Sequence, residues 1–297
     1  MFDTIGFIGL GMMGAPMSKR LLDAGYKIVG FDVSHDALER ARTEGITIAS
    51  SPRGVAEQCG LVITMLANSE IVEKVVLGAD GVITGAVQGA VLIDMTSAYP
   101  MSTRKIAAEL EKQHISMLDA PVSGGVSGAE QGTLSIIAGG DNEIFERCLP
   151  IFEVLGKNIF HMGSLGSGHS MKAINNFLSA CSVVATAEAV VVATKAGLDP
   201  NKVVEVLQVS TGRNYATDRK FPKFVLPRTF DDGFRVDLLS KDLDIFTRLA
   251  RELGVPTFTA HTVHQIYHFA LSHGYGQKGH TSIVQLIEEW AGVEIKG

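Results

Sequence analysis

The sequence is poor in cysteine, in basic residues and in uninterrupted apolar stretches. Its three cysteines, Cys59, Cys148 and Cys181, are odd in number, far apart and without the paired spacing of a zinc site. This usage argues against a disulfide framework and is typical of a reducing compartment, so we expect a cytoplasmic protein. Lysine and arginine number 26 against 32 acidic residues, which gives a net charge of −6 with no basic run. Such a balance argues against nucleic acid as the main partner.

Long apolar segments are equally scarce. The most apolar stretch, residues 180–193, is interrupted by Ser182, Thr186 and Glu188, and it suits a buried helix better than a membrane span. The first residues include the acid Asp3 and no basic cluster, so we expect neither a signal peptide nor a membrane partner. With 46% hydrophobic and 20% charged residues over 297 positions, the composition predicts a packed globular protein of one large or two medium domains.

Two patterns of secondary structure divide the chain. The first half alternates short apolar runs with amphipathic stretches, which predicts parallel βαβ units. The predicted strands are 4–8, 27–31, 61–65, 91–94, 116–120 and 134–138, and the predicted helices are 15–24, 36–44, 69–77 and 102–112. After the glycine-rich stretch 163–168 the pattern is almost wholly helical, with helices predicted over 170–196, 200–208, 240–253, 256–272 and 282–290. We therefore expect an α/β Rossmann-type N-terminal domain, residues 1–164, and an all-α C-terminal domain, residues 165–297, for substrate binding and oligomerisation.

A glycine-rich turn follows the first predicted strand and opens the first helix. Its pattern is G-x-G-x-x-G, formed by Gly9, Leu10, Gly11, Met12, Met13 and Gly14. In a dinucleotide-binding fold the first glycine permits a tight turn, the second lets a pyrophosphate approach the backbone, and the third permits close packing of helix and strand. The phosphates would lie at a helix N-terminus, where free N–H groups favour anions. A purely structural glycine turn is the alternative, but the position in the chain favours cofactor binding.

Asp32 bears on the choice of cofactor. It lies 18 residues after Gly14, at the end of the next predicted strand, where an acid hydrogen-bonds the ribose 2′-OH. A carboxylate here would repel a 2′-phosphate, and no arginine follows it immediately, so NAD is favoured over NADP. The alternative is that Asp32 merely caps the following helix.

Two further loops contribute candidate cofactor residues. Met65 and Leu66 lie at the end of one predicted strand, and Thr96 follows the next. Loops at the carboxyl ends of strands line the ligand crevice of such sheets. An ordinary strand-to-helix loop, with Thr96 or Ser97 as a helix N-cap, explains the pattern equally well.

The segment 119–134 is the most informative part of the chain. It places Ser123 beside the pair Gly124 and Gly125, after the rigid Pro121. Glycines let the backbone come close to a ligand. Ser123 and the neighbouring N–H groups could therefore surround a small polar substrate.

Lys172 is the candidate catalytic group. It opens the long helix after a glycine-rich entry, shares a helix face with Asn176 and has apolar flanks. Burial of a lysine stem can bring the pKa of the amine towards the working pH, and a neighbouring asparagine can orient the amine or a substrate hydroxyl. Asn175 is a candidate substrate contact as well, and the sequence leaves open which asparagine is functional. A solvated surface pair is the alternative.

Weaker signals come from the C-terminal half. Lys241 could reach the cofactor or a substrate carboxylate, or it could form a solvated pair with Asp242. Arg213 lies in a turn and suits bidentate binding of a carboxylate, although a surface salt bridge explains it too. Three histidines, at positions 261, 264 and 268, have helical spacing but no completing ligand, so we expect no metal.

Four separated motifs resemble those of the β-hydroxyacid dehydrogenase family, which includes 3-hydroxyisobutyrate dehydrogenase. They are residues 7–17, 119–133, 166–176 and 241–242, and together they span nearly the whole chain. Ala67 departs from a proline that is frequent in the family, and Met95-Thr96 replaces a more usual Ser-Ser or Ser-Thr. Within the family, residues 210–215 and 230–234 look most like 2-(hydroxymethyl)glutarate dehydrogenase and phenylserine dehydrogenase-type members.

The resemblance assigns roles to the motif residues. It implies that Lys172 is the catalytic lysine and that Asn176 assists it. It also implies that Thr96 and Lys241 contact the cofactor. The substrate carboxylate would be held by Ser123, Gly124 and Gly125.

Together these observations predict an NAD-dependent oxidoreductase that reversibly oxidises the 3-hydroxyl of a small 3-hydroxy carboxylic acid to the semialdehyde or ketone. Lys172 would act as general acid/base, and the protein would be a homodimer or homotetramer. The same site run backwards would make a semialdehyde reductase in vivo. A non-catalytic NAD-binding protein is the alternative of another class, and the presence of Lys172 with Ser123 argues against it. Imine reductases share the architecture but usually lack this lysine.

Overall fold

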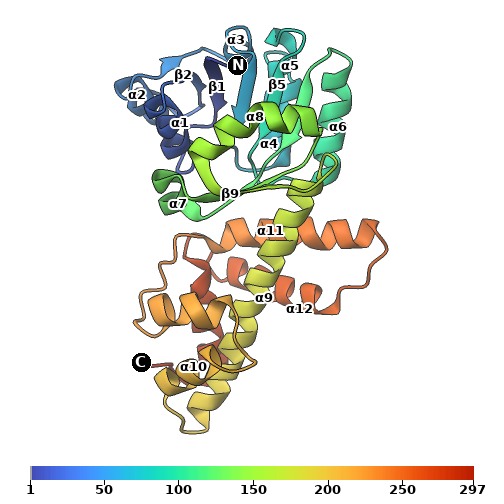
Figure 1. The fold of residues 1–297 in the computed structure, drawn as a ribbon. Helices are drawn as coiled ribbons and strands as arrows, with labels where there is room; N and C mark the ends of the chain where they lie inside the picture. Colours follow the sequence, from blue (N-terminus) through green and yellow to red (C-terminus); the bar gives the residue numbers. More distant parts are fainter. Residues whose placement is uncertain (1) are drawn as a thin grey trace. The chain divides into compact units, whose positions relative to one another are not determined.

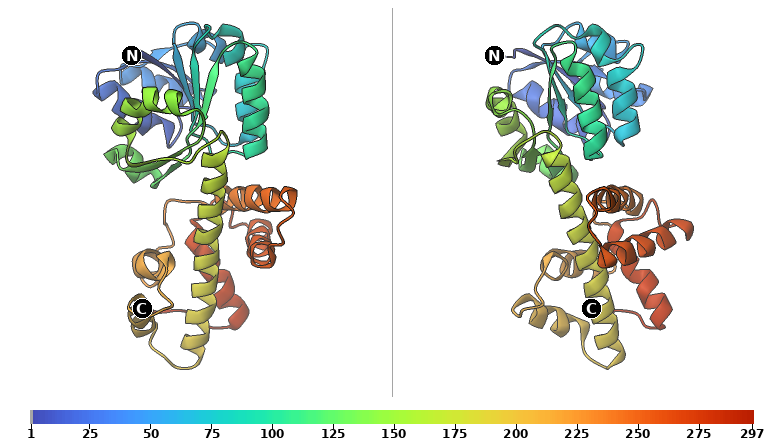
Figure 2. Two further views of the ribbon diagram at one scale, coloured as in Figure 1. Left: turned by 45° about the vertical axis from the view of Figure 1, so that its right-hand side comes forward. Right: turned by 90° about the vertical axis from the view of Figure 1, so that its right-hand side faces the viewer.

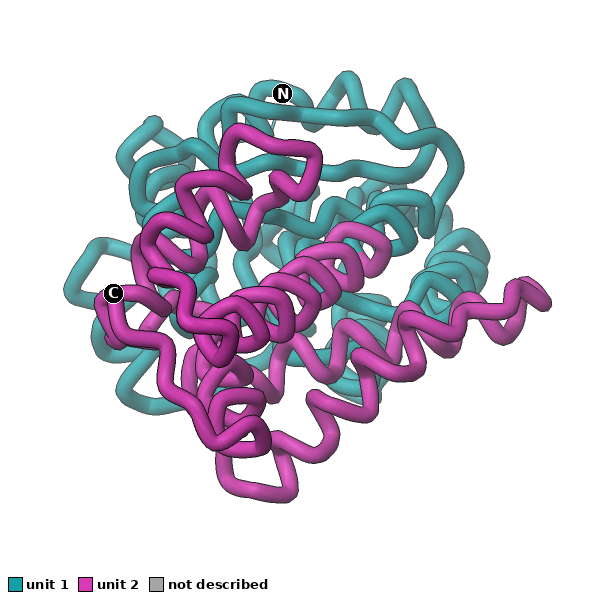
Figure 3. Tube along the Cα trace, turned by 90° about the horizontal axis from the view of Figure 1, so that it is seen from below, with its two compact units in different colours: residues 1–172 teal, residues 173–297 magenta. Residues whose placement is uncertain are grey.

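The computed structural model describes residues 2–297, which form two compact units, Met1–Lys172 and Ala173–Gly297 (Figure 3). The first unit is built on a six-stranded parallel sheet with the strand order β3-β2-β1-β4-β5-β6. Its strands are β1 (Thr4–Ile8), β2 (Lys27–Phe31), β3 (Thr47–Ile48), β4 (Leu61–Thr64), β5 (Val91–Asp94) and β6 (Ser116–Asp119). The predicted Rossmann-type sheet is confirmed, and the short β3 is the strand that the pattern missed.

The strand order reverses beside β1. The chain starts in the middle of the sheet, runs outward through β2 to β3, and returns to β4 on the other side of β1. Ligands of such sheets bind beyond the carboxyl ends of the strands at this reversal. The topology therefore predicts a ligand site formed by the loops that follow β1, β2, β4 and β5.

Alternation of side chains along each strand separates two hydrophobic clusters, one on each face of the sheet. In β1, Ile5 and Phe7 join one cluster and Ile8 joins the other, as a period of two requires. Residues of α1 (Gly14–Asp23), α2 (His35–Thr43) and α8 (Asn142–Leu155) complete the first cluster. Residues of α3 (Pro52–Ala56), α4 (Ser69–Leu77), α5 (Val82–Gly85) and α6 (Pro100–Glu111) complete the second. Figures 1 and 2 show helices on both faces of the sheet.

A second, three-stranded sheet follows, with the order β7-β8-β9. Its strands are β7 (Val122–Ser123), β8 (Leu134–Ala138) and β9 (Gly156–His161), and α7 (Gly125–Gln131) lies between the first two in the chain. The predicted strand 134–138 is confirmed, but it belongs to this smaller sheet. Helix α8, which is capped by Asp141, was not predicted because it contains Pro150, and an internal proline is rare in helices. Strand β9 was not predicted either.

The second unit is helical, as expected. Its elements are the larger part of α9 (Ser167–Lys195), α10 (Pro200–Gln208), the π-helix η1 (Ala216–Val225), α11 (Val236–Glu252), α12 (Phe258–Ser272), the 3₁₀-helix η2 (His280–Ser282) and α13 (Ile283–Ala291). One core joins these helices, and Phe221 and Tyr267 are its largest fully buried side chains. The pattern missed η1, whose π-helical turns leave the period of 3.6 residues.

Helix α9 is unusually long and apolar. Within residues 2–297 it is the one helix long and apolar enough, by composition alone, to cross a membrane, and 39% of its most apolar window is buried. Core helices of soluble proteins share these properties, so the finding is weak evidence for a membrane span.

Candidate active site

The loop between β1 and α1 is shaped by close backbone contacts at two glycines. Gly9 has a φ of +98°, and a Cβ atom there would lie 2.2 Å from the carbonyl oxygen of Met65. A Cβ at Gly14 would lie 1.8 Å from the carbonyl oxygen of Gly9, so neither position accepts a side chain. At Gly11, by contrast, nothing lies within 4 Å of the position of a Cβ.

The start of α1 suits an anion. Its first turn has no side-chain cap and no acidic residue, so its N–H groups face no competing acceptor from a capping side chain. The open backbone at Gly11 lets a pyrophosphate approach these groups closely. The residues of this loop therefore fit the dinucleotide that the sequence predicts.

Asp32 stands one residue beyond β2 and is held by two backbone N–H groups. Its Oδ2 accepts from the N–H of Leu10 at 2.7 Å, and its Oδ1 accepts from the N–H of Ser34 at 2.8 Å. The N-cap of α2 is Ser34, whose hydroxyl accepts from the N–H of Ala37. The alternative that Asp32 caps this helix is therefore wrong, and the carboxylate lies beside the glycine loop.

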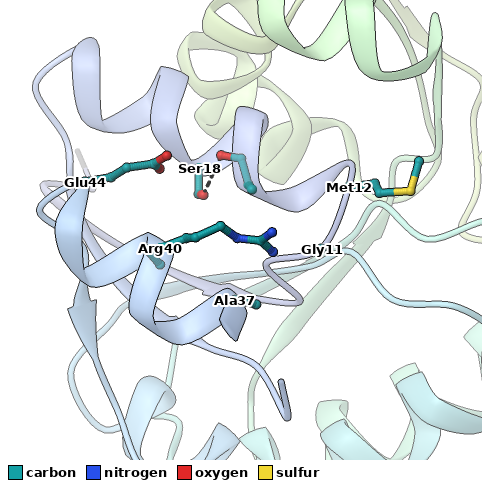
Figure 4. A pocket seen from close by; sticks show the side chains of 8 residues that line it. Gly11, Met12, Ser18, Ala37, Arg40 and Glu44 are labelled. Carbon is teal, nitrogen blue, oxygen red and sulfur yellow. Dashed lines mark hydrogen bonds between the residues drawn. The ribbon is translucent and has the colours of Figure 1, made fainter. Parts of the chain in front are cut away.

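A cavity of about 240 Å³ lies next to this loop, between α1 and α2 (Figure 4). Its lining residues are Gly11, Met12, Ala15, Ser18, Ala37, Arg40, Ala41 and Glu44. In Figure 4 the Arg40 side chain extends across the cavity towards the Gly11 end. One cationic side chain, Arg40, and one anionic side chain, Glu44, line the cavity.

The loops after β4 and β5 are tied together by Thr96. Its hydroxyl accepts from the N–H of Leu66 at 3.0 Å, and its own N–H donates to Oδ1 of Asp94 at 3.1 Å. The N–H of Met65 donates to the carbonyl of Ile8, so the same loop is also held to β1. Helix α6 takes Tyr99 as its N-cap residue, so the alternative in which Thr96 caps a helix is wrong.

Asp94, at the end of β5, belongs to a cluster of buried ionisable side chains that the sequence analysis missed. The other members of this cluster are Asp119 and His169. The side chain of His169 is fully buried, 3.8 Å from Oδ2 of Asp94 and 3.7 Å from Oδ2 of Asp119. Burial raises the pKa of Asp94, and the neighbouring His169 opposes this shift. The available signal was positional, because both acids end strands and His169 stands three residues before Lys172.

Ser123 ends β7 directly before a turn that requires glycine. It lies opposite Ser135 of β8 and is half-buried. The turn takes a φ of +138° at Gly124 and +64° at Gly125, in the region that disfavours other residues. Side chains at positions 124 and 125 would strain this turn, so the backbone that follows Ser123 requires glycine.

Lys172 and Asn176 lie one turn apart on the continuous helix α9. Lys172 is 8% exposed and Asn176 is 4% exposed, whereas Asn175 is exposed to solvent. Asn175 donates to the side-chain oxygen of Asn176 at 3.0 Å. Burial therefore singles out Asn176 over Asn175.

Asp242 is a second site residue that the sequence analysis left without a role. It is 3% exposed on α11, accepts from the side-chain amide of Asn176 at 2.5 Å and pairs with the Nζ of Lys241 at 3.2 Å. The second unit thus brings together Asn176, Asp242 and Lys241. An acid at a buried position of an amphipathic helix was the signal that could have found it.

Arg213 and two of the three histidines have other contacts in the structure. Arg213 is exposed and pairs with Asp218 at 2.9 Å, which is the surface salt bridge that the sequence left open. The rings of His264 and His268 on α12 contact each other in a tilted arrangement, with centroids 4.4 Å apart. Over residues 2–297, no group of three or more His, Cys, Asp or Glu side chains has an arrangement that could hold a metal ion.

A parallel sheet that reverses its order beside a glycine loop, with an acid fixed at the end of the second strand, defines a dinucleotide-binding protein. Comparison with protein families agrees. The family described as "NAD binding domain of 6-phosphogluconate dehydrogenase" matches residues 4–163, and "NAD-binding of NADP-dependent 3-hydroxyisobutyrate dehydrogenase" matches residues 166–287. The chain belongs to the β-hydroxyacid dehydrogenase family, and the resemblance seen in its motifs is confirmed.

Individual relatives cover the chain almost end to end. The 2-(hydroxymethyl)glutarate dehydrogenase of Eubacterium barkeri is 36% identical over 99% of this chain and 97% of its own. The NAD-dependent L-serine dehydrogenase of Pseudomonas aeruginosa is 35% identical over 97% of this chain and 99% of its own. Among solved structures, Mycobacterium tuberculosis 3-hydroxyisobutyrate dehydrogenase with L-serine has a TM-score of 0.91 and 31% identity, and it covers 97% of this chain and 99% of its own. These matches support NAD as the cofactor.

Proposed function

We propose that this protein is an NAD-dependent dehydrogenase that reversibly oxidises the 3-hydroxyl of a small 3-hydroxy carboxylic acid to the semialdehyde or ketone. Three of its relatives are named for 2-(hydroxymethyl)glutarate, 3-hydroxyisobutyrate and L-serine. Each of these molecules carries a CH₂OH group on the carbon next to a carboxylate. A primary alcohol in that position is therefore the substrate feature we expect, with the semialdehyde as product.

One observation carries the proposal, namely a buried lysine one helical turn before a buried asparagine on α9. When bound, NAD accepts the hydride from the carbon that bears the hydroxyl. Lys172 takes the hydroxyl proton through its Nζ in oxidation and returns it in reduction, so a single group serves both directions. Asn176, held by Asp242, orients the hydroxyl or the amine and carries no proton itself.

The remaining site residues have binding roles in this proposal. Ser123 and the N–H groups of Gly124 and Gly125 bind the substrate carboxylate, which requires an acid as substrate. Asp32 binds the adenosine ribose, and Lys241 contacts the cofactor. Leu10, Met12, Met13, Met65, Leu66 and Thr96 line the dinucleotide beside the glycine loop. Substrate contacts by Asn175 and Arg213 stay predictions.

The finer features of the prediction belong to this proposal as well. A homodimer or homotetramer would cover the apolar side chains that helices of the second unit expose, such as Val192 at 68% and Phe258 at 85%. A cytoplasmic protein fits the reduced cysteines. In vivo the enzyme would work as a dehydrogenase or, with the same residues, as a semialdehyde reductase.

A panel of 3-hydroxy acids and the matching semialdehydes tests the proposal, with NADH formation or loss followed by absorbance. Acids with a CH₂OH group on the carbon next to the carboxylate should be oxidised, and the corresponding 2-hydroxy acids, as matched controls, should not. Binding of NAD without turnover of any member would instead support a non-catalytic NAD-binding protein. Light scattering on the same preparation measures the number of subunits.

A further inference from the structure

We propose that His169 is a positioning residue, which, together with Asp119, locks the first turn of α9 to the carboxyl edge of the parallel sheet and so fixes Lys172. All the contacts that carry this inference lie within the first unit. It rests on the proposed function in one respect, namely that Lys172 is the proton carrier.

Asp119 anchors the start of α9 through the backbone. Its carboxylate is fully buried, and its two oxygens accept from the N–H of Gly166 and the N–H of His169, each at 2.7 Å. These are N–H groups that have no partner inside the helix. The packing here is tight, because a Cβ at Gly168 would lie 2.2 Å from the carbonyl oxygen of Ile137. A carboxylate at the end of β6 thus does what a capping side chain does in other helices.

The imidazole of His169 makes the second half of the lock. Its Nε2 lies 2.8 Å from the carbonyl oxygen of Thr96, and its Nδ1 lies 2.7 Å from the hydroxyl of Thr103 on α6. A carbonyl oxygen only accepts, so Nε2 carries a hydrogen and donates it. The Thr103 hydroxyl can donate its hydrogen to Nδ1 when this nitrogen carries none. When Nδ1 carries a hydrogen, it donates to the Thr103 oxygen, and the hydroxyl donates to the carbonyl of Tyr99 instead.

This ring therefore connects the helix of the lysine to the loop of the cofactor. Thr96 accepts from His169 through its carbonyl, while its hydroxyl accepts from the N–H of Leu66. Lys172 follows three residues after His169, about 4.5 Å further along the helix axis. A displacement of about 1 Å at a reacting group can cost about 10²-fold in rate. Loss of the imidazole should accordingly impair turnover and leave the glycine loop and Asp32 intact.

Two variants of His169 separate hydrogen bonding from mere bulk. His169→Leu fills the space but removes both bonds, and we expect kcat to fall about 10–100-fold with little change in the Kd for NAD. His169→Gln keeps an amide that donates to Thr96 and accepts from Thr103, and it should restore kcat to within about fivefold of wild type.

If His169→Leu does not fold, Thr103→Val removes only the partner of Nδ1 and should lower kcat about three- to tenfold. Tyr267→Phe, which deletes a buried hydroxyl that bonds His280 in the second unit, is the matched control and should leave kcat unchanged.

A double variant tests whether His169 acts through the lysine. In a Lys172→Ala background, His169→Leu should lower kcat no further, because the group that it positions is gone. An equal loss in both backgrounds, or wild-type turnover of His169→Leu, would overturn the inference.

Hydrogen exchange keeps the inference testable if no substrate is turned over. In His169→Leu the backbone N–H groups of residues 169–172 should exchange about tenfold faster or more, while Tyr267→Phe should leave them unchanged. Unchanged exchange in His169→Leu would refute the lock whatever the activity. Faster exchange in a protein that oxidises no 3-hydroxy acid would refute the proposed function and keep the lock.

Discussion

Replacement of Lys172 by methionine isolates the amine from its apolar stem. The side chain is 8% exposed, so alanine would leave a cavity and lower stability for reasons unrelated to chemistry. Methionine has nearly the length of the lysine stem and no charge, and its burial costs no desolvation of an ammonium group. We therefore expect Lys172→Met to fold and to bind NAD like the wild type.

The expected loss of rate follows from the role of the amine. Proton transfer by a positioned side chain contributes about 10²–10⁴-fold, which corresponds to about 2.7–5.4 kcal/mol of transition-state stabilisation. Lys172→Met should lower kcat by such a factor. Lys172→Arg should fail almost as badly, since a guanidinium does not deprotonate near neutral pH. Asn176→Ala should cost less, because this residue orients the proton carrier.

The assay compares kcat for the variants with NAD binding measured by fluorescence on the same samples. Added methylamine should restore part of the turnover of Lys172→Ala, in which a small amine can occupy the space of the lost side chain. Near-wild-type kcat in a folded Lys172→Met variant would remove Lys172 from the mechanism.

Four other predictions concern the cofactor, the substrate carboxylate, Asp242 and His264. Asp32→Ser combined with Val33→Arg should shift kcat/KM from NAD towards NADP, and a wild type that already prefers NADP would contradict the role of Asp32. The methyl ester of a good substrate should lose about 10²-fold in kcat/KM, because a neutral ester accepts weaker hydrogen bonds from Ser123 than an ionised carboxylate does. Equal turnover of the ester would refute carboxylate binding at Ser123. Asp242→Asn keeps the shape but not the charge, and kcat/KM should fall about tenfold, with wild-type kinetics as the contrary result. Burial and the neighbouring His268 lower the pKa of His264 from 6.5. The unfolded chain therefore binds this proton at a higher pH than the folded chain does. The stability contributed by neutral His264 is present above about pH 6.5 and is lost as the pH falls through the lowered pKa. His264→Leu should therefore flatten the pH dependence of the unfolding free energy below about pH 6.5, and an unchanged slope would contradict the assignment.

Local patterns in the sequence were sufficient for the parallel sheet. Strands β1 and β2 have the predicted bounds because apolar residues there alternate between two buried faces. Pattern alone did not predict α8, which continues through Pro150, or β9, in which half of the six residues are exposed and no long apolar run occurs.

The site divides in the same way. Glycines and an acid at fixed spacing were recognisable, because their function depends on backbone geometry that repeats among dinucleotide-binding folds. His169, Asp94 and Asp242 were not recognised as a group or as site residues. Their significance comes from burial and from partners about 30–70 residues away in the chain, and a charged residue has the same letter whether it is solvated or buried.

The two backbone N–H groups that hold Asp32 affect how the protein discriminates between cofactors. An ionised carboxylate has about four acceptor sites, and the N–H groups of Leu10 and Ser34 occupy one on each oxygen. One site on each oxygen thus stays open for the two hydroxyls of a ribose, and the rotamer is set before the nucleotide arrives. A freely rotating acid could swing away from a 2′-phosphate and tolerate it. Both oxygens of this carboxylate are held by backbone N–H groups, so a 2′-phosphate placed beside Asp32 would meet a charge that cannot rotate away. In the proposed role of Asp32, discrimination against NADP would therefore depend on rigidity as much as on charge.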